Sequence, residues 1–357
     1  MGEQLPVTPD DIDAAWLTDA LADRHPGVSV ASVEVLERHE VTNHHARLRV
    51  GYQHAAGAPD TMFCKLPPLD PARRDSINSS GMGRREALFY RELAPRLDLR
   101  VPEAHVALHD ERDGTFVLLL EDLDARGCTV SNGPMGPPVD AAAVLLESLA
   151  RMHVRFEDPA RRDAEAAWVP TIRSTGDYGA RLLQLGLDHH RDKLSDSFAA
   201  IARLYIDHTA VLQEAWRAGP QTVIHGDTHV GNLFFDHGSI GLLDWGIINV
   251  STPMREVSYF LTMSLTVADR RVHDAELLRH YLSVREAEGG SPISFDDAWR
   301  AHRLHVAYTV PASCQVVTFP ADASDRRKVF AAAFLERAEA AIADLDALAA
   351  LREATGL

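Results

Sequence analysis

The spacing of hydrophobic and polar residues changes along the chain and divides it into two parts. Apolar and polar positions alternate in residues 28–36, 46–53 and 61–66, which predicts antiparallel strands with one buried face. The apolar run FVLLL at 116–120 predicts a buried strand. Apolar positions recur every three or four residues in the segments 8–23, 81–93, 140–156, 177–194, 197–218, 274–288, 296–307 and 325–351, which predicts helices.

This order of elements predicts an α+β protein with two lobes. The first lobe covers residues 1–121 and combines a small antiparallel β-sheet with an N-terminal helix over 8–23. That helix begins at Thr8, where a hydroxyl cap precedes a proline and two acidic residues. The second lobe covers residues 122–357 and is mainly helical. The apolar positions of its last helix favour packing on its own lobe over a seam between two copies of the chain, and the oligomeric state stays open.

Composition and charge limit the kinds of molecule that the protein is expected to bind. Among 357 residues, 36 Lys and Arg stand against 52 Asp and Glu, a net charge of −16 that disfavours a nucleic-acid partner. Three separated cysteines indicate neither a disulfide framework nor a thiolate zinc site. The first residues show neither the basic start nor the apolar core of a signal peptide, so we expect none, and no apolar run reaches the ~18 residues that a membrane span needs. We therefore expect a cytoplasmic protein that acts away from membranes.

The stretch VIHGDTHVGNLFF, residues 223–235, crowds polar side chains between two apolar segments. In one interpretation, His225, Asp227 and His229 line one side of an extended segment and bind a transition metal. That interpretation gives no role to Asn232 or to Asp244. In the other, the stretch is a phosphotransfer loop, which needs a carboxylate at the acceptor hydroxyl and oxygen ligands for Mg²⁺.

The second interpretation uses all the polar residues. Asp227 and Asn232 have the spacing of the kinase catalytic loop. A turn at 235–239 followed by the apolar segment IGLL at 240–243 predicts a hairpin that brings Asp244 beside Asn232. Two metal ligands and a base would then face one point.

The motifs HGDTHVGN and LLDWG together resemble those of the aminoglycoside phosphotransferase and choline kinase superfamily, over residues 28–262. The tail GLLDWGIINVSTPMREVSYFL is most similar to the ecdysteroid-kinase-like and related bacterial branch. The resemblance implies the bilobal fold of protein kinases, ATP and Mg²⁺ as cofactors, Asp227 as catalytic base, and Asn232 and Asp244 as magnesium ligands.

The same resemblance implies an upstream lysine paired with a helix acid. Lys65, at the end of the strand TMFCKL, is the candidate for the nucleotide phosphates. Glu86 is its expected partner and Glu92 the alternative, because one helix offers both acids. The segment at the end of FVLLLEDL resembles the hinge between the lobes, where backbone N–H and C=O groups near Glu121 to Leu123 would bind adenine.

Three further residues are expected to brace the catalytic loop. His225 and His229 flank the base, and Glu256 stands where the family usually has aspartate. The phosphate-covering segment departs from the family, because residues 37–48 contain no glycine. Thr42, Asn43 and the two histidines after them would have to supply side-chain donors instead.

The leading hypothesis is an ATP-dependent kinase that phosphorylates a hydroxyl group of a small molecule. A catalytically silent nucleotide-binding protein of kinase fold and, third, a metal-dependent hydrolase using the HxDxH cluster remain as alternatives. Aminoglycosides, amine alcohols, sugars and lipophilic alcohols are all candidate acceptors. An aromatic and histidine-rich group in the helical lobe predicts the acceptor pocket, although residues three apart on a helix more often pack: Tyr259, Trp299, His302, His305 and Tyr308.

Overall fold

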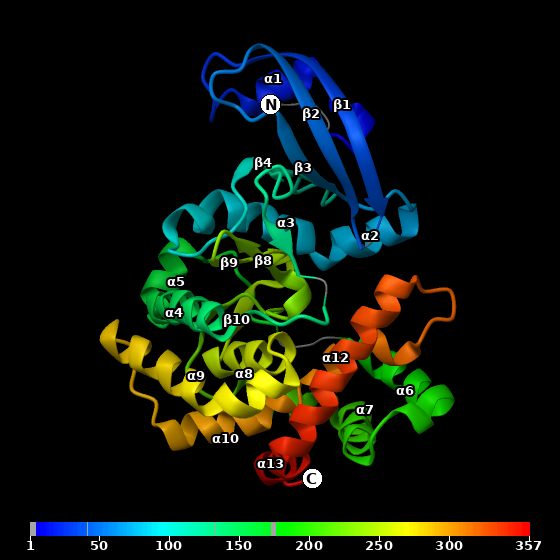
Figure 1. Ribbon diagram of the computed structural model, residues 1–357, viewed down its shortest axis with the longest axis vertical. Coiled ribbons are helices and arrows are strands. Elements are labelled where there is room, and N and C mark those ends of the chain that lie inside the picture. Colours follow the sequence, from blue (N-terminus) through cyan, green and yellow to red (C-terminus); the bar gives the residue numbers. More distant parts are fainter. Residues whose placement is uncertain (1–4, 41, 132, 173–175) are drawn as a thin grey trace. The chain divides into compact units, whose positions relative to one another are not determined.

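The structure is a computed structural model that describes residues 5–40, 42–131, 133–172 and 176–357 (Figure 1). The chain divides into two compact units. The first combines residues 1–129 with Gly241–Ile247, and the second combines Val130–Ile240 with Ile248–Leu357. The predicted α+β class is confirmed. The first unit extends beyond the expected limit at 121 and also takes in Asp244, which therefore belongs to the same unit as Lys65.

A five-stranded antiparallel sheet forms the centre of the first unit, in the order β1-β2-β3-β5-β4. Its alternating residues bury one face, including Leu48, Met62 and Leu119, beneath α1 (Ala14–Leu21). β4 was not predicted, because its alternation AHVALH is short and half-exposed. The strand bounds are β1 Ser29–Glu40, β2 His44–His54, β3 Thr61–Leu66, β4 Ala104–His109 and β5 Phe116–Glu121.

The predicted N-terminal helix is wrong in its first turn. Thr8 does start a helical segment, but that segment is a 3₁₀ turn, Pro9–Asp11, closed by the Asp11 carboxylate on the Thr8 backbone N–H. Asp13 then caps α1 by accepting from the backbone N–H of Trp16. Asp11 and Asp13 therefore stabilise the starts of two separate helical segments, where the apolar spacing predicted one continuous helix.

Two helices follow β3 in the first unit. α2 (Pro71–Ser80) was not predicted, since none of its residues is buried and it has no apolar stripe. α3 (Met82–Leu88) continues as a π-helical turn, Phe89–Leu93, so the predicted helix over 81–93 is present with a change of geometry. At Gly83 an added Cβ would lie 1.9 Å from the Phe116 ring, so glycine lets α3 approach the sheet closely.

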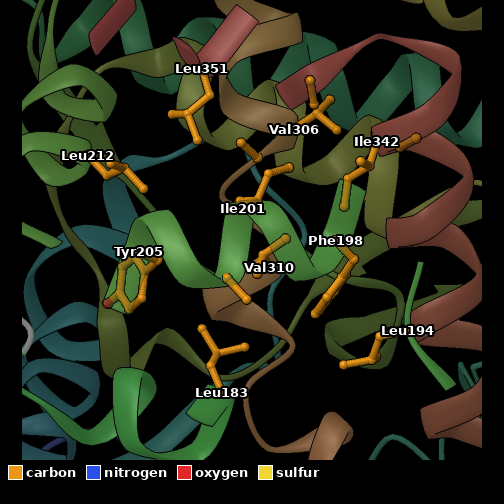
Figure 2. Packing of buried hydrophobic residues seen from close by; sticks show 14 of the residues in the cluster. Leu183, Leu194, Phe198, Ile201, Tyr205, Leu212, Val306, Val310, Ile342 and Leu351 are labelled. Atoms are coloured by element: carbon orange, nitrogen blue, oxygen red, sulfur yellow. The ribbon is translucent and has the colours of Figure 1, made fainter. Parts of the chain in front are cut away.

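Helices dominate the second unit, where Leu183, Phe198, Ile201, Val310 and Leu351 form part of one apolar core (Figure 2). The core joins helices that are distant in sequence. The bounds are α4 Val139–Arg155, α5 Pro159–Glu165, α6 Tyr178–His190, α7 Asp196–Arg217, α8 Pro253–Ser264, α9 Val267–Ala287, α10 Phe295–Val306, α11 Thr309–Ala312, α12 Asp325–Asp344 and α13 Ala347–Thr355.

The last predicted helix, 325–351, is two helices. α12 ends at Asp344, and Asp346 has a left-handed backbone with φ of 50° before α13 begins. No glycine or proline marks this break, so the apolar spacing gave no sign of it. Within the described ranges, no helix combines the length and apolar character that crossing a bilayer requires.

Short strands frame the polar loop of the second unit. β7 (Thr222–Ile224) pairs with β10 (Asn249–Ser251), and the loop leaves from the end of β7. β8 (Leu233–Asp236) begins directly after the loop, and the predicted hairpin follows with β9 (Ser239–Leu242). A two-residue strand, β6 (Thr129–Val130), completes the strands of the described chain.

Candidate active site

Lys65 is the centre of a buried ion cluster in the first unit. Its side chain is only 6% exposed, and its Nζ lies 2.6 Å from Glu86 Oε2 and 3.1 Å from Asp244 Oδ1. Burial alone would lower the pKa of Lys65, but the Asp244 and Glu86 carboxylates more than offset it, so the Lys65 pKa is raised. The amine is therefore a fixed cation. Of the two candidate acids, Glu86 pairs with Lys65, whereas Glu92 pairs with Arg91.

Helix α3 and the segment after Asp244 hold each other in place. The Glu86 carboxylate accepts from the backbone N–H of Trp245, and burial raises the Glu86 pKa against the pull of Lys65. The rings of Phe89 and Trp245 stack with centroids 3.7 Å apart. Asp244 itself has φ of 58°, a left-handed conformation that costs about 1–3 kcal/mol in a residue with a side chain. These contacts hold Asp244 in its strained backbone conformation, while its side chain remains 45% exposed.

The glycine-free segment forms the tip of the β1–β2 hairpin. Thr42 is exposed and Asn43 is buried; Val41, between the strands, lies outside the described residues. His45 lies opposite Lys65 in the β2–β3 register. Its ring lies against Phe63, with centroids 5.2 Å apart.

The two expected adenine-contacting residues follow β5. The Glu121 carboxylate is bound by the Arg100 guanidinium at 2.9 Å and 3.0 Å, so its side chain has a structural partner. The Leu123 carbonyl accepts from the backbone N–H of Cys128. Between them, Asp122 binds Arg47 at 2.6 Å and ties this segment to β2, a contact that the sequence did not indicate.

Asp227 lies in the polar loop of the second unit and is held from several sides. Its backbone N–H donates to His225 Nδ1 at 3.1 Å, and Asn232 Nδ2 donates to its carbonyl at 2.9 Å. His229 Nε2 lies 3.5 Å from Asp227 Oδ2, while His229 Nδ1 accepts from Gly231. The buried Tyr259 phenol hydrogen-bonds the Asp227 carboxylate. The amide nitrogen of Asn232 is engaged within the loop, so its oxygen is the atom it can offer to a cation.

Glu256, on α8, braces the start of this loop. One carboxylate oxygen accepts from the backbone N–H of Gly226 at 2.8 Å, and the other lies 2.9 Å from His153 Nε2. All three groups are buried, and His153 Nδ1 continues the network to the Tyr281 hydroxyl at 2.8 Å. Burial would raise the pKa of Glu256, but the hydrogen bond and charge of His153 outweigh it, so the pKa is lowered.

Sequence reasoning missed His153, which closes the last turn of an amphipathic helix and carries no separate signal. It also missed the aromatic cover of His229. Phe334 and Phe330, on α12, lie edge-on to the His229 ring with centroids 5.4 Å and 5.9 Å away. Their helical spacing predicted packing, but their partner His229 lies 101 and 105 residues earlier in the sequence.

The predicted acceptor residues fall into two groups. Tyr259 and Tyr308 lie together, with ring centroids 5.9 Å apart, and Arg255 donates to the Tyr308 hydroxyl at 2.6 Å. Trp299 instead packs on Phe295 and the helical core. The two histidines are fully engaged inside the protein.

His302 contacts Ser258 and Asp274 through its two ring nitrogens. His305 contacts the carbonyls of Ala301 and Trp216. Burial lowers the pKa of His305 to about 4. The structure therefore places both histidines in the helix packing and not with Tyr259.

The HxDxH segment does not form a metal-binding cluster. Within the described ranges, no group of three His, Cys, Asp or Glu residues is arranged to hold a metal ion. His225 and His229 each use Nδ1 to accept a backbone N–H within the loop. The geometry gives the metal-hydrolase alternative no support.

Residues 40–304, more than half of the chain, match the model of the phosphotransferase enzyme family, and the chain belongs to that family. The predicted resemblance to the aminoglycoside phosphotransferase and choline kinase superfamily is thereby confirmed. Membership supports an enzyme that phosphorylates small molecules.

Solved structures agree on the fold. One is a protein provisionally described as an aminoglycoside phosphotransferase from Ralstonia eutropha, with 15% identity, coverage of 92% of this chain and 97% of that chain, and a TM-score of 0.51. Another is the GDP and kanamycin complex of APH(2")-IIIa, with 15% identity, coverage of 92% and 98%, and a TM-score of 0.50. Among curated proteins, no sequence is similar enough to count as a match.

The Glu256 bridge predicts a specific loss of stability. In Glu256→Ala, the buried N–H of Gly226 and the ring of His153 lose their shared partner, so unfolding free energy should fall by about 1–3 kcal/mol. Glu256→Gln should lose less, because its amide oxygen can still accept from Gly226. Urea denaturation measures both, with the exposed Glu286→Ala on α9 as control. Equal stability of Glu256→Ala and wild type would contradict the bridge.

The buried His305 predicts a pH dependence of stability. Its pKa in the fold, about 4, lies below the usual 6.5, so the unfolded chain takes up its proton first as the pH falls. The contribution of the neutral His305 ring to the free energy of unfolding is retained above pH 6.5. It is lost between pH 6.5 and about 4, and the loss is up to about 3 kcal/mol. His305→Gln should flatten that part of the curve of unfolding midpoint against pH. An unchanged slope in the variant would show that His305 titrates normally.

Proposed function

We propose that the protein is an ATP-dependent phosphotransferase that transfers the γ-phosphoryl group to a hydroxyl group of a small molecule. The observation that carries this proposal is the buried Lys65, held as a cation by Glu86 and Asp244. A stabilising role alone does not account well for a buried ion cluster, because removing charges from water costs several kcal/mol per ion. Clusters of ionisable groups with perturbed pKa values are more often found at binding or catalytic sites.

The donor atoms of Lys65 suit a nucleotide phosphate. An ammonium group has three N–H donors, and the two carboxylates use two of them. The third is suited to a phosphate oxygen. Asp244 offers a carboxylate and Asn232 an amide oxygen, the hard donors that Mg²⁺ prefers, so each is proposed as a magnesium ligand. Mg²⁺ would neutralise charge on the phosphates.

Asp227 is proposed as the catalytic base. Its carboxylate would accept the proton of the acceptor hydroxyl while the hydroxyl oxygen forms a bond to phosphorus and the bond to the leaving nucleoside diphosphate breaks. The hydrogen bonds from Asn232 and Tyr259 limit the positions that this carboxylate can take. Such orientation is the main contribution a protein makes to this chemistry.

A second candidate is a nucleotide-binding protein of the same fold without turnover. The observation that favours it is the hairpin tip, which has no glycine to let the backbone approach the phosphates. Asp227, Asn232 and Asp244 favour the enzyme. The two candidates differ in turnover but not in nucleotide binding, so an assay of turnover by the wild type separates them.

Asp227→Asn should lower turnover by about 10²–10⁴-fold, because amide nitrogen and oxygen cannot take the hydroxyl proton. Its affinity for the nucleotide should stay within about twofold of wild type. The measurement is ADP release from Mg-ATP, screened against aminoglycosides, amine alcohols, sugars and lipophilic alcohols. Asp236→Asn, on β8 after the loop, serves as control.

Acceptor-dependent ADP release by wild type, lost in Asp227→Asn and kept in Asp236→Asn, would support the enzyme. Nucleotide binding with no release against any acceptor would favour the silent protein. Equal release by Asp227→Asn and wild type would contradict the role of Asp227.

A further inference from the structure

We infer that His45 is a ligand of the nucleotide polyphosphate and donates through Nε2 to an oxygen of the same phosphates that Lys65 binds. This inference rests on the proposed function and deepens it. It assigns to one side chain the contact that a glycine-rich turn would make through its backbone. Every observation that carries it lies within the first unit.

Strand register places His45 on the same face as Lys65. The two residues are directly opposite each other where β2 pairs with β3. Opposite residues of an antiparallel pair extend from the same face of the sheet, with Cβ atoms about 4.5–5.5 Å apart. The adjacent His44 belongs to the other face by the same alternation. A ligand on Lys65 would therefore meet His45 and not His44.

The His45 ring has a polar atom that the described protein does not use. Its Nε2 is buried and has no hydrogen-bond partner within the described ranges. Buried polar atoms of this kind are uncommon, and a missing ligand is one explanation for them. The ring lies against Phe63, with the two ring planes at 54°.

The protonation state of the His45 ring allows it to donate a hydrogen bond beside the Lys65 cation. Burial, reinforced by the charge of Lys65, lowers the pKa of His45 to about 4, so the ring is neutral at pH 7. A neutral imidazole carries one N–H donor. It can thus donate to a phosphate oxygen without repelling Lys65.

The competing explanation is that His45 only packs on Phe63. His45→Phe separates the two, because phenylalanine keeps an aromatic ring but removes both nitrogens. His45→Gln restores a donor. His54→Phe is the matched control, since this exposed histidine lies at the other end of the same strand, about 30 Å away.

The experiment measures binding of a non-hydrolysable ATP analogue with Mg²⁺, of ADP and of adenosine by calorimetry, with the unfolding midpoint of each variant as a check of folding. His45→Phe should weaken the ATP analogue about tenfold to a hundredfold, the range of hydrogen bonds to charged groups, and leave adenosine unchanged. His45→Gln should recover part of the loss, and His54→Phe should bind like wild type.

Unchanged binding of the ATP analogue by His45→Phe would overturn the inference and leave the proposed function intact. An equal loss for adenosine and the ATP analogue would also overturn it, because packing alone would then explain the effect. Failure of wild type to bind any nucleotide would overturn the proposed function and this inference together.

Discussion

The pairing of Lys65 with two carboxylates is the constraint on which the first unit depends. Glu86 comes from α3 and Asp244 from a segment 179 residues after Lys65, so one buried cation joins three distant parts of the chain. The Trp245 stack on Phe89 and the left-handed backbone of Asp244 follow from the need to bring that carboxylate to the amine. Removing either acid would leave a buried charge with one partner fewer.

In the second unit, hydrogen bonds from other elements hold the loop around Asp227 in place. The loop around Asp227 is polar and lies between buried strands, so its backbone needs partners from other elements. Glu256 supplies one from α8, and His153 fixes Glu256 from α4. The Glu256 carboxylate therefore contacts both the loop and that helix.

Local chemistry explains what the sequence could predict and what it could not. Alternation and helical spacing identified most strands and helices, and the Asp227, Asn232 and Asp244 motif identified the class. The choice of Glu86 over Glu92 depends on which face of α3 is buried, which sequence spacing leaves open. His153, His302 and His305 needed their partners from other helices to be assigned. The α12–α13 break at Asp346 lacks any glycine or proline signal.

The most direct test of a magnesium-dependent nucleotide site is the shift in unfolding midpoint with ATP and Mg²⁺, compared between wild type and Asp244→Asn. At about a hundredfold excess over its dissociation constant, the ligand should stabilise the fold by about 2.7 kcal/mol. We expect a Mg²⁺-dependent shift in wild type that is weaker in Asp244→Asn. No shift with any nucleotide, together with a large shift from Zn²⁺ or Mn²⁺ alone, would contradict it.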